Sequence, residues 1–513
     1  MKIRSSIKNW IIGFLFVLVI SATSVSCKMI SEINFSLGQH TEVVNSSQFK
    51  VTSGKLAIKN VSVLSADSEL MLRNKTVLIK NDKIEAIEDS VNIPEGYYVI
   101  DGTNKFLIPG LIDSHVHIKK SPNDLLLYLA NGITQVGEMT GMKEHIQYQK
   151  EIEEGIRLGP DIYIASPKVS SEKGIRATFR SWFEKRQQNY TSIKAARRAV
   201  KKYKDKGYKA VKLASQVFDR DIYFAINDEA KKQDIPVIGH LPVYVYMEDL
   251  YTSGQSQLSH IASIIQSEMN EFRGVNYKNA DAFLSYFKNK ADSIAIKRKE
   301  SNIAISTTLW VYETMPEQDF NLSEFLKTIP LEYQNPGWLE QSKFSGGWLP
   351  GTGNSYENPD NTDPESKRQS EIYWNTQTEA LHVMTIALAK HGVTITAGTD
   401  ANGAHGAIAG FSLHNELESL NNAGMTNAQV IQSATLATAQ WMGINCGKID
   451  VGYEADLVIL NKNPLENIQN TNNIDAVITN GKYLGRETLD KMLQEVKKAN
   501  NRSRKVNIDE YLD

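Results

Sequence analysis

Cysteine, an excess of charge of either sign and long hydrophobic runs are all scarce in this chain. Only two of its 513 residues are cysteines, and Cys27 belongs to the export signal described below, so Cys446 is left alone and no disulfide is expected. The 57 basic and 59 acidic residues give a net charge of −2, so no nucleic-acid partner is expected. Hydrophobic residues make up 41% of the chain, which agrees with a large soluble enzyme that buries a sizeable core.

An apolar run at residues 10–20 follows three basic residues near the N-terminus. The run is too short for a membrane-spanning helix of about 20 residues, but it suits the core of a signal peptide. The sequence Ser24-Val-Ser-Cys27 that follows resembles a bacterial lipobox. We therefore expect residues 1–27 to be a lipoprotein-type signal peptide and the protein to reach the bacterial cell envelope, facing the periplasm or anchored in the outer membrane through a lipid on Cys27. A simple cleaved signal is the alternative.

Histidine is also uncommon, with ten in the chain, and two of them end one apolar run. His115 and His117 follow Pro109-Gly-Leu-Ile-Asp-Ser, a strand-like segment. Side chains one residue apart on a strand point to the same side. Two neutral imidazoles placed in this way can reach one divalent ion at roughly 2.0 to 2.1 Å. The alternative is a pair of histidines on a half-exposed strand.

Four further polar residues each lie inside or just after a short apolar run: Lys212, His240, His260 and Asp400. A lysine with a pKa of about 10.4 is protonated and is a poor metal ligand unless it is modified, so a lysine reaching from a strand end to solvent is the alternative for Lys212. A single histidine after a strand is often a packed or capping residue. For Asp400 the alternative is an N-cap of the helix that follows it.

The rest of the chain divides by pattern. Residues 49–108 and 445–486 are strand-rich, with a hairpin predicted from 76–80 through Asn81-Asp82 to 83–87. Residues 109–444 alternate strands and helices, which predicts parallel βα units. Residues 28–48 suggest a polar tether, and 487–513 a charged C-terminal tail with a solvated helix end.

Together these motifs resemble the amidohydrolase superfamily over roughly residues 50–485. The likeness is to its imidazolonepropionase-like and Xaa-Pro dipeptidase-like branch, and it is clearest from Gly398-Thr-Asp-Ala to Gly410-Phe-Ser-Leu-His and from Gly447 to Leu460. The resemblance implies an α/β fold, a (β/α)8 TIM barrel at 109–444 with a small β-sandwich built from the segments at 49–108 and 445–486. Active sites of such barrels lie at the C-terminal ends of the strands.

The resemblance also implies a metal centre with two divalent ions, which we expect to be Zn2+. Its ligands would be His115, His117, Lys212, His240, His260 and Asp400, with Lys212 carboxylated and bridging the ions. A metal-activated hydroxide would attack the substrate, and Asp400 would act as general base and acid. If Lys212 is not modified, a mononuclear site is the alternative.

The substrate contacts are less specific. Dipeptidase-type relatives carry His-Ala-Tyr where this chain has His240-Leu-Pro242, and a histidine in a loop where this chain has none. In that loop Arg176 and Arg180 could bind a substrate carboxylate, although surface arginines are the alternative. His405 could contact substrate because it lies in a loop after Asp400. His145, His382, His391 and His414 are expected to be structural.

Residues 310–375 form a long, aromatic-rich stretch between the seventh and eighth predicted strands. Long loops in compact domains are usually functional or disordered, so a lid over the active site is one interpretation and a homo-oligomer contact is another. The leading hypothesis is an exported amidohydrolase that cleaves a C–N bond in a small or dipeptide-like substrate. An esterase, lactonase or phosphotriesterase, and a non-catalytic binding lipoprotein, are the alternatives.

Overall fold

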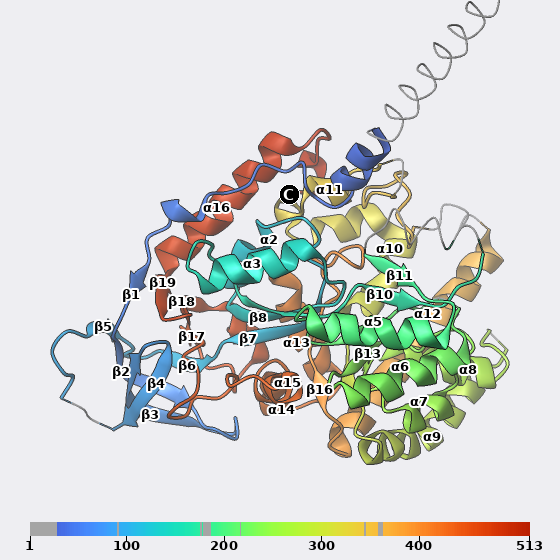
Figure 1. Ribbon diagram of the computed structural model, residues 1–513, viewed down its shortest axis with the longest axis horizontal. Coiled ribbons are helices and arrows are strands. Elements are labelled where there is room, and N and C mark those ends of the chain that lie inside the picture. Colours follow the sequence, from blue (N-terminus) through green and yellow to red (C-terminus); the bar gives the residue numbers. More distant parts are fainter. Residues whose placement is uncertain are drawn as a thin grey trace, which may run out of the picture.

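The computed structural model describes residues 28–89, 92–174, 177, 186–215, 217–276, 278–342, 345–357 and 363–512. Cys27, Arg176 and Arg180 lie outside these residues, so the predictions made for them remain predictions. Figure 1 shows two parts: a β-sheet at one end of the molecule and a larger body in which helices surround further strands. None of the helices among the described residues combines the length and apolarity needed to cross a membrane.

The sheet at the end of the molecule joins the two strand-rich segments of the sequence. Nine strands pair in the order β1-β19-β18-β17-β6-β2-β3-β4, with β5 added beside β2. They are β1 (Thr52–Ser53), β2 (Leu56–Leu64), β3 (Met71–Lys80), β4 (Lys83–Glu88), β5 (Tyr98–Asp101), β6 (Phe106–Pro109), β17 (Leu457–Leu460), β18 (Ile474–Thr479) and β19 (Lys482–Gly485). The N- and C-terminal segments meet where β17 runs antiparallel to β6. The sandwich arrangement of this sheet stays a prediction.

The predicted hairpin is confirmed. Strands β3 and β4 pair antiparallel up to Lys80 and Lys83. The two residues between them, Asn81 and Asp82, both have left-handed backbones, with φ values of 49° and 61°. A two-residue hairpin loop favours this conformation because its twist matches that of the strands, and Asn and Asp adopt it more readily than most residues.

The body is built on parallel strands, as the alternating pattern predicts. One sheet has the order β7-β8-β9 and the other β11-β10-β12-β13-β14-β15-β16, and neighbouring strands in both sheets run parallel. The strands are β7 (Leu111–Val116), β8 (Ile133–Glu138), β9 (Asp161–Ile164), β10 (Lys168–Ser170), β11 (Gln187–Asn189), β12 (Val211–Leu213), β13 (Val237–Gly239), β14 (Gln257–Ser259), β15 (Ala304–Ser306) and β16 (Ile395–Thr396). Ser114 N donates to Ala397 O over 2.9 Å, and Ala165 bridges to Ala210, so hydrogen bonds also link the two sheets to each other.

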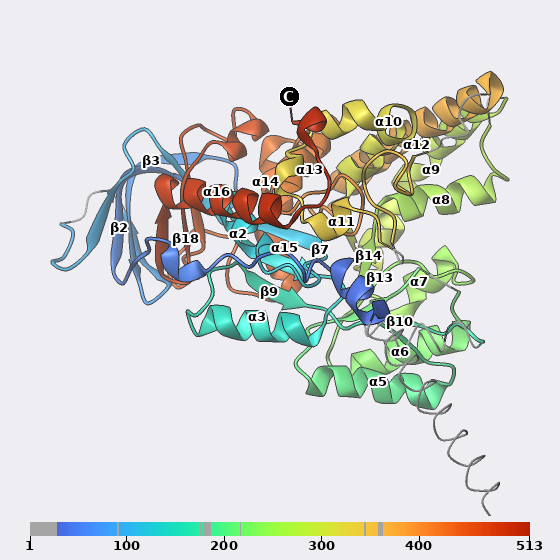
Figure 2. The ribbon, with the colours of Figure 1, turned by 90° about the horizontal axis from the view of Figure 1, so that it is seen from above.

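Helices cover these strands. They are α2 (Asp124–Ala130), α3 (Lys143–Glu153), α5 (Ile193–Asp205), α6 (Arg220–Lys232), α7 (Met247–Ser253), α8 (Ala262–Glu271), α9 (Ala280–Glu300), α10 (Leu309–Lys327), α11 (Pro336–Leu339), α12 (Pro364–Lys390), α13 (Phe411–Asn422), α14 (Asn427–Ser433), α15 (Leu436–Met442) and α16 (Arg486–Ser503). Figure 2 shows α8, α9, α10 and α12 gathered at the end of the body away from the nine-stranded sheet.

Helix α5 illustrates why these segments are helical. Ala196, Ala199, Val200 and Tyr203 are spaced three or four residues apart and are all buried, so they form one apolar stripe against the body. The Ser192 side chain accepts a hydrogen bond from Ala195 N and thereby caps the first turn.

Two terminal segments, residues 28–48 and 487–513, pack apolar residues on the body, while Lys498 and Arg502 at the charged end of the C-terminal helix stay exposed. Phe35 and Leu37 are buried, and Leu37 O accepts a hydrogen bond from Lys120 N. Within α16, Leu489, Met492 and Val496 are buried on one face, while the charged residues take the other. Both segments look polar in sequence because they contain few apolar residues. Those few are buried, and their burial attaches each segment to the body.

The aromatic-rich stretch is mostly helical, so the prediction of a long loop there is wrong. Helix α10 begins three residues after β15 ends, and α12 begins at Pro364, where Asp363 caps it and proline occupies the first turn. Trp338 and Trp348 are buried in a small core with Leu322 and Tyr511. These tryptophans therefore serve as core residues of the same chain.

Candidate metal centre

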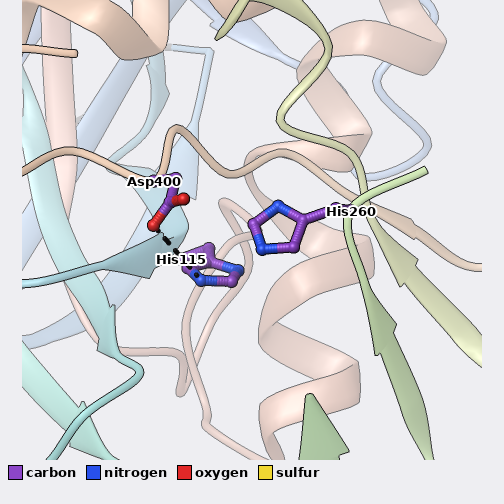
Figure 3. Close-up of side chains that lie close together, drawn as sticks. All are labelled: His115, His260 and Asp400. Atoms are coloured by element: carbon purple, nitrogen blue, oxygen red, sulfur yellow. Dashed lines mark ion pairs between the residues drawn. The ribbon is translucent and has the colours of Figure 1, made fainter. Parts of the chain in front are cut away.

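The six predicted metal ligands converge on one buried site. His115 lies in β7 and His117 directly follows it, Lys212 lies in β12, and the other three follow strands β13, β14 and β16. Ring centroids are 4.8 Å apart between His115 and His260, and 4.9 Å apart between His240 and His260. Figure 3 shows His115, His260 and Asp400 facing one another. Strands that are far apart in sequence thus bring these side chains together, as the strand-end pattern predicts.

The donor atoms fit a cation. His115, His260 and Asp400 each offer a ligand atom, and these atoms lie within 4.8 Å of one another. Asp400 Oδ1 lies 2.8 Å from His117 Nε2 and 3.6 Å from His115 Nε2. Even so, Asp400 Oδ1 and His115 Nδ1 are buried without a partner that meets hydrogen-bond geometry. Buried polar atoms without partners are costly, and a divalent ion would satisfy them.

The electrostatics of the site favour the ligand forms of these groups. Burial lowers the pKa of His115 and His240 well below the usual value, and it lowers the pKa of His260 to about 4. Burial alone would raise the pKa of the Asp400 carboxyl, but contact with His117 outweighs this effect and lowers the pKa. The site therefore presents neutral imidazoles and an ionised carboxylate, which are the forms that bind a metal.

Lys212 is the only amine in this set of six. Its side chain is fully buried, and Nζ donates to Ser259 Oγ over 2.8 Å. Burial, and to a smaller degree the charge of Lys168, lower the pKa of Lys212 to about 7. A large share of Lys212 is therefore a neutral amine near neutral pH, which is the form that can act as a nucleophile toward carbon dioxide.

The backbone is strained at the ligands. His260 and Asp400 have φ values of 66° and 55°, and Thr308 beside His260 has a φ of 51°. Residues other than glycine adopt this region uncommonly, and such strain concentrates at functional sites. Gly403 allows the close approach, because a Cβ there would lie 2.1 Å from Asp400 Oδ1 and 2.3 Å from the His117 ring.

Several residues that support the ligands were not predicted. Thr308 Oγ1 donates to Thr307 O, so it accepts from His260 Nδ1 over 2.8 Å and leaves the Nε2 lone pair of His260 free. Thr140 Oγ1 lies 3.0 Å from His117 Nδ1 and plays a similar part. Thr140 lies two residues after the end of β8. Its place just after an apolar run in the sequence could have indicated that it lies near the site.

Replacing Thr308 by valine should lower metal affinity about 10- to 100-fold, because the hydrogen bond that orients His260 is lost. The measurement is a metal titration of the apo protein, with Thr308→Ser as the control that keeps the hydroxyl. Equal affinities of the valine and serine variants would mean that Thr308 does not orient His260.

The structure does not bring His405 to the metal ligands' cavity. Its Nδ1 lies 3.1 Å from Ser355 Oγ, and its ring contacts those of Trp348 and Tyr356 edge-on. The pKa of His405 falls to about 4 because the ring is buried. His405 thus packs against Tyr356 and does not line the cavity itself. These contacts do not support the prediction that His405 contacts substrate.

The other histidines make structural contacts. His414 bonds through Nδ1 to Thr471 Oγ1 and through Nε2 to Asn131 O, which confirms its structural role. His382 and His391 pair with Glu313 and Asp292. His145 is buried and bonds to Lys119 O.

A cavity of about 1040 Å³ opens from the ligands. His240, His260 and Asp400 line one end of it, and the loop at 241–247, one face of α8, the start of α10 and Tyr356 line the remainder. The predicted insertion thus contributes to the site through Tyr312 and Tyr356.

Comparison with known proteins finds similarity to an enzyme family over part of the chain. Residues 354–484 match the amidohydrolase family. A 5-methylthioadenosine/S-adenosylhomocysteine deaminase from Dictyoglomus turgidum is 41% identical over 64 residues, which cover 12% of this chain and 15% of that protein. A dihydroorotase from Listeria monocytogenes is 44% identical over 63 residues, 12% of this chain and 14% of that protein. The matches to these first curated relatives thus span only about a seventh of the relatives' length.

Longer likenesses are weaker in sequence. A 5'-deoxyadenosine deaminase from Methanosphaera stadtmanae is 23% identical over 460 residues, 84% of this chain and 93% of that protein. The solved structure of a bottromycin amidohydrolase is 18% identical with a TM-score of 0.63, covering 87% of this chain and 90% of that one. A prolidase complexed with N-methylphosphonate-L-proline is 18% identical with a TM-score of 0.60, covering 84% and 100%. The family match and this shared fold confirm the predicted resemblance to the amidohydrolases.

Proposed function

We propose that this chain is a metal-dependent amidohydrolase that cleaves a C–N bond in a small amide or dipeptide-like substrate. The observation that carries the proposal is the convergence of the six candidate ligands in one buried cluster at the end of a large cavity. The proposal includes a closed (β/α)8 barrel and a small β-sandwich, and the hydrogen bonds between the two parallel sheets support closure. Similarity to a prolidase and to an amidohydrolase agrees with this reaction class.

His115, His117 and Asp400 would hold one divalent ion, and His240 and His260 the other, with a carboxylated Lys212 between them. Zn2+ suits the nitrogen donors of this set. When bound, such ions lower the pKa of water from about 15.7 to about 7 and polarise a carbonyl oxygen. The lowered pKa of Lys212 supports the carboxylation, because only the neutral amine can attack carbon dioxide.

Asp400 supplies the proton transfers. Its ionised carboxylate accepts the proton of the attacking water and returns it to the nitrogen of the leaving amine. Burial of the cluster excludes bulk water, which would otherwise weaken these interactions.

A matched pair of substrates tests the reaction class. Protein reloaded with Zn2+ is assayed on an amide and an ester that share the same acyl group. Faster turnover of the amide, relative to the uncatalysed rates, is expected. Cleavage of the ester alone would instead support an esterase or lactonase, and cleavage of neither would support a binding lipoprotein.

We also propose that the protein is exported and lipid-anchored at Cys27, on the strength of the apolar run and the lipobox-like motif alone. Replacing Cys27 by serine should move the protein from the membrane fraction to a soluble or unprocessed form, because the lipid attachment site is lost. Fractionation and mass spectrometry of protein from its own host make the measurement. An unmodified Cys27 in mature wild-type protein would leave secretion without an anchor.

A further inference from the structure

We propose that the substrate is an amide with a long, uncharged aromatic or alkyl arm, which lies along α10 while hydrogen-bonding groups on the substrate face α8. The inference rests on the proposed function, and it names the substrate class of the same site. It follows from how the cavity wall is divided between apolar, polar and charged side chains.

One wall of the cavity is apolar and aromatic. Val311, Tyr312 and Met315 line it from the first turns of α10, and Tyr356 continues it. The Tyr312 ring lies edge-on to His260 at 6.1 Å between centroids, so the wall begins at a metal ligand. The ring of His405 packs edge-on against the ring of Tyr356, with 5.3 Å between the centroids. Rigid aromatic side chains of this kind bind apolar groups with little loss of side-chain entropy.

The hydroxyls of this wall are available. Neither Tyr312 nor Tyr356 makes a side-chain hydrogen bond to any other part of the chain that the structure describes. The side chain of tyrosine carries a phenolic O–H group at neutral pH. Each can therefore donate a hydrogen bond to a substrate oxygen.

Helix α8 contributes uncharged polar side chains to another part of the lining. Ser263, Gln266, Ser267 and Asn270 of α8 line it, with helical spacing that places them on one face. Hydroxyl and amide groups on one face give a row of donors and acceptors for a neutral polar group.

Apart from the candidate ligands, the charged residues of the lining are Glu248, Asp249 and Glu271, and each of them lies near a cation. Asp249 accepts a bidentate contact from Arg220, and Lys290 lies 2.8 Å from Glu271. Among the described residues that line the cavity there is no lysine or arginine. A charged arm would thus lose hydration without gaining a counter-ion, which is costly.

Size points to a long arm. Ligand cavities are typically about 300 to 1,000 Å³, and this cavity of about 1040 Å³ lies at the upper end. Tyr244 and Tyr246 extend it outward at the lip, where they are 65% and 67% exposed. A short acetyl amide would leave most of the cavity lining in contact with water.

The test uses three anilides of equal length on Zn2+-loaded protein, identical except for a neutral, a carboxylate or an ammonium group at the end of the arm. The neutral anilide should have the lowest KM, by about tenfold, because a charged end is desolvated without a partner. Tyr312→Ala and Tyr356→Ala should each raise the KM of the neutral anilide about tenfold. The control is Tyr98→Ala, since Tyr98 is a half-exposed tyrosine on β5, in the nine-stranded sheet.

A second readout does not depend on turnover. Calorimetric binding of the intact neutral anilide to metal-free protein, which should not cleave it, should weaken in both tyrosine variants and stay unchanged in Tyr98→Ala. A lower KM for either charged anilide, or equal binding by all variants, would overturn the substrate class while leaving the hydrolase in place. If none of the three anilides is cleaved but the neutral anilide binds to metal-free protein as expected, the proposed function fails instead.

Discussion

Asp400→Asn should lower kcat by about two to four orders of magnitude, because general acid and base catalysis contributes that much and an amide cannot take the proton. KM should change far less, since the substrate is held mainly by the cavity walls. Asparagine matches aspartate in shape and tolerates the left-handed backbone of this position, so the fold should persist. Steady-state kinetics with metal content measured on the same samples makes the comparison.

A second carboxylate variant controls for general effects of lost charge. Asp228 lies on α6 with a half-exposed side chain in contact with Arg197 and Lys232, and it is not among the residues that line the cavity. Asp228→Asn should leave kcat unchanged. If Asp400→Asn retains wild-type turnover with its metals bound, Asp400 is not the proton carrier.

Lys212→Ala should lose one metal and most activity. A carbamate on Lys212 would supply a bridging negative charge that an alanine cannot. Short carboxylates or bicarbonate should restore part of the activity, because they can occupy the space left by the side chain. In 13C-labelled bicarbonate, wild-type protein should give a carbamate resonance that the variant lacks.

Lys209 is the matched control, because it is an exposed lysine three residues earlier in the chain. Lys209→Ala should keep the metals, the activity and the resonance. Wild-type protein with two metals and no carbamate resonance would rule out the modified lysine.

The set of candidate ligands could be proposed from sequence, because its members follow a local pattern that resembles that of the amidohydrolases. His115 and His117 alternate on one strand, and the other ligands follow short apolar runs, so parallel strand ends bring them together. The hairpin at Asn81 and Asp82 was predictable for the same reason, since its turn chemistry lies within two residues.

Features that depend on contacts between distant segments could not be predicted in this way. Tyr312 and Tyr356 look like any aromatic residues in sequence, and only the fold places them beside His260 and Asp400. Phe35 and Leu37 are two apolar residues in a polar stretch, and their burial depends on the surface that receives them.

The helices of residues 310–375 were missed although a local signal existed. Asp363-Pro364 is a strong start for α12, and Leu322, Phe325 and Leu326 have helical spacing in α10. The kink of α10 at Asn321, together with Pro316, obscured a continuous pattern.

The most direct test of the account is the metal content of the purified chain. Elemental analysis should find about two divalent ions per chain, as the donor set allows, and chelation should abolish hydrolysis until Zn2+ is restored. Metal-free protein with undiminished hydrolytic activity would contradict the account.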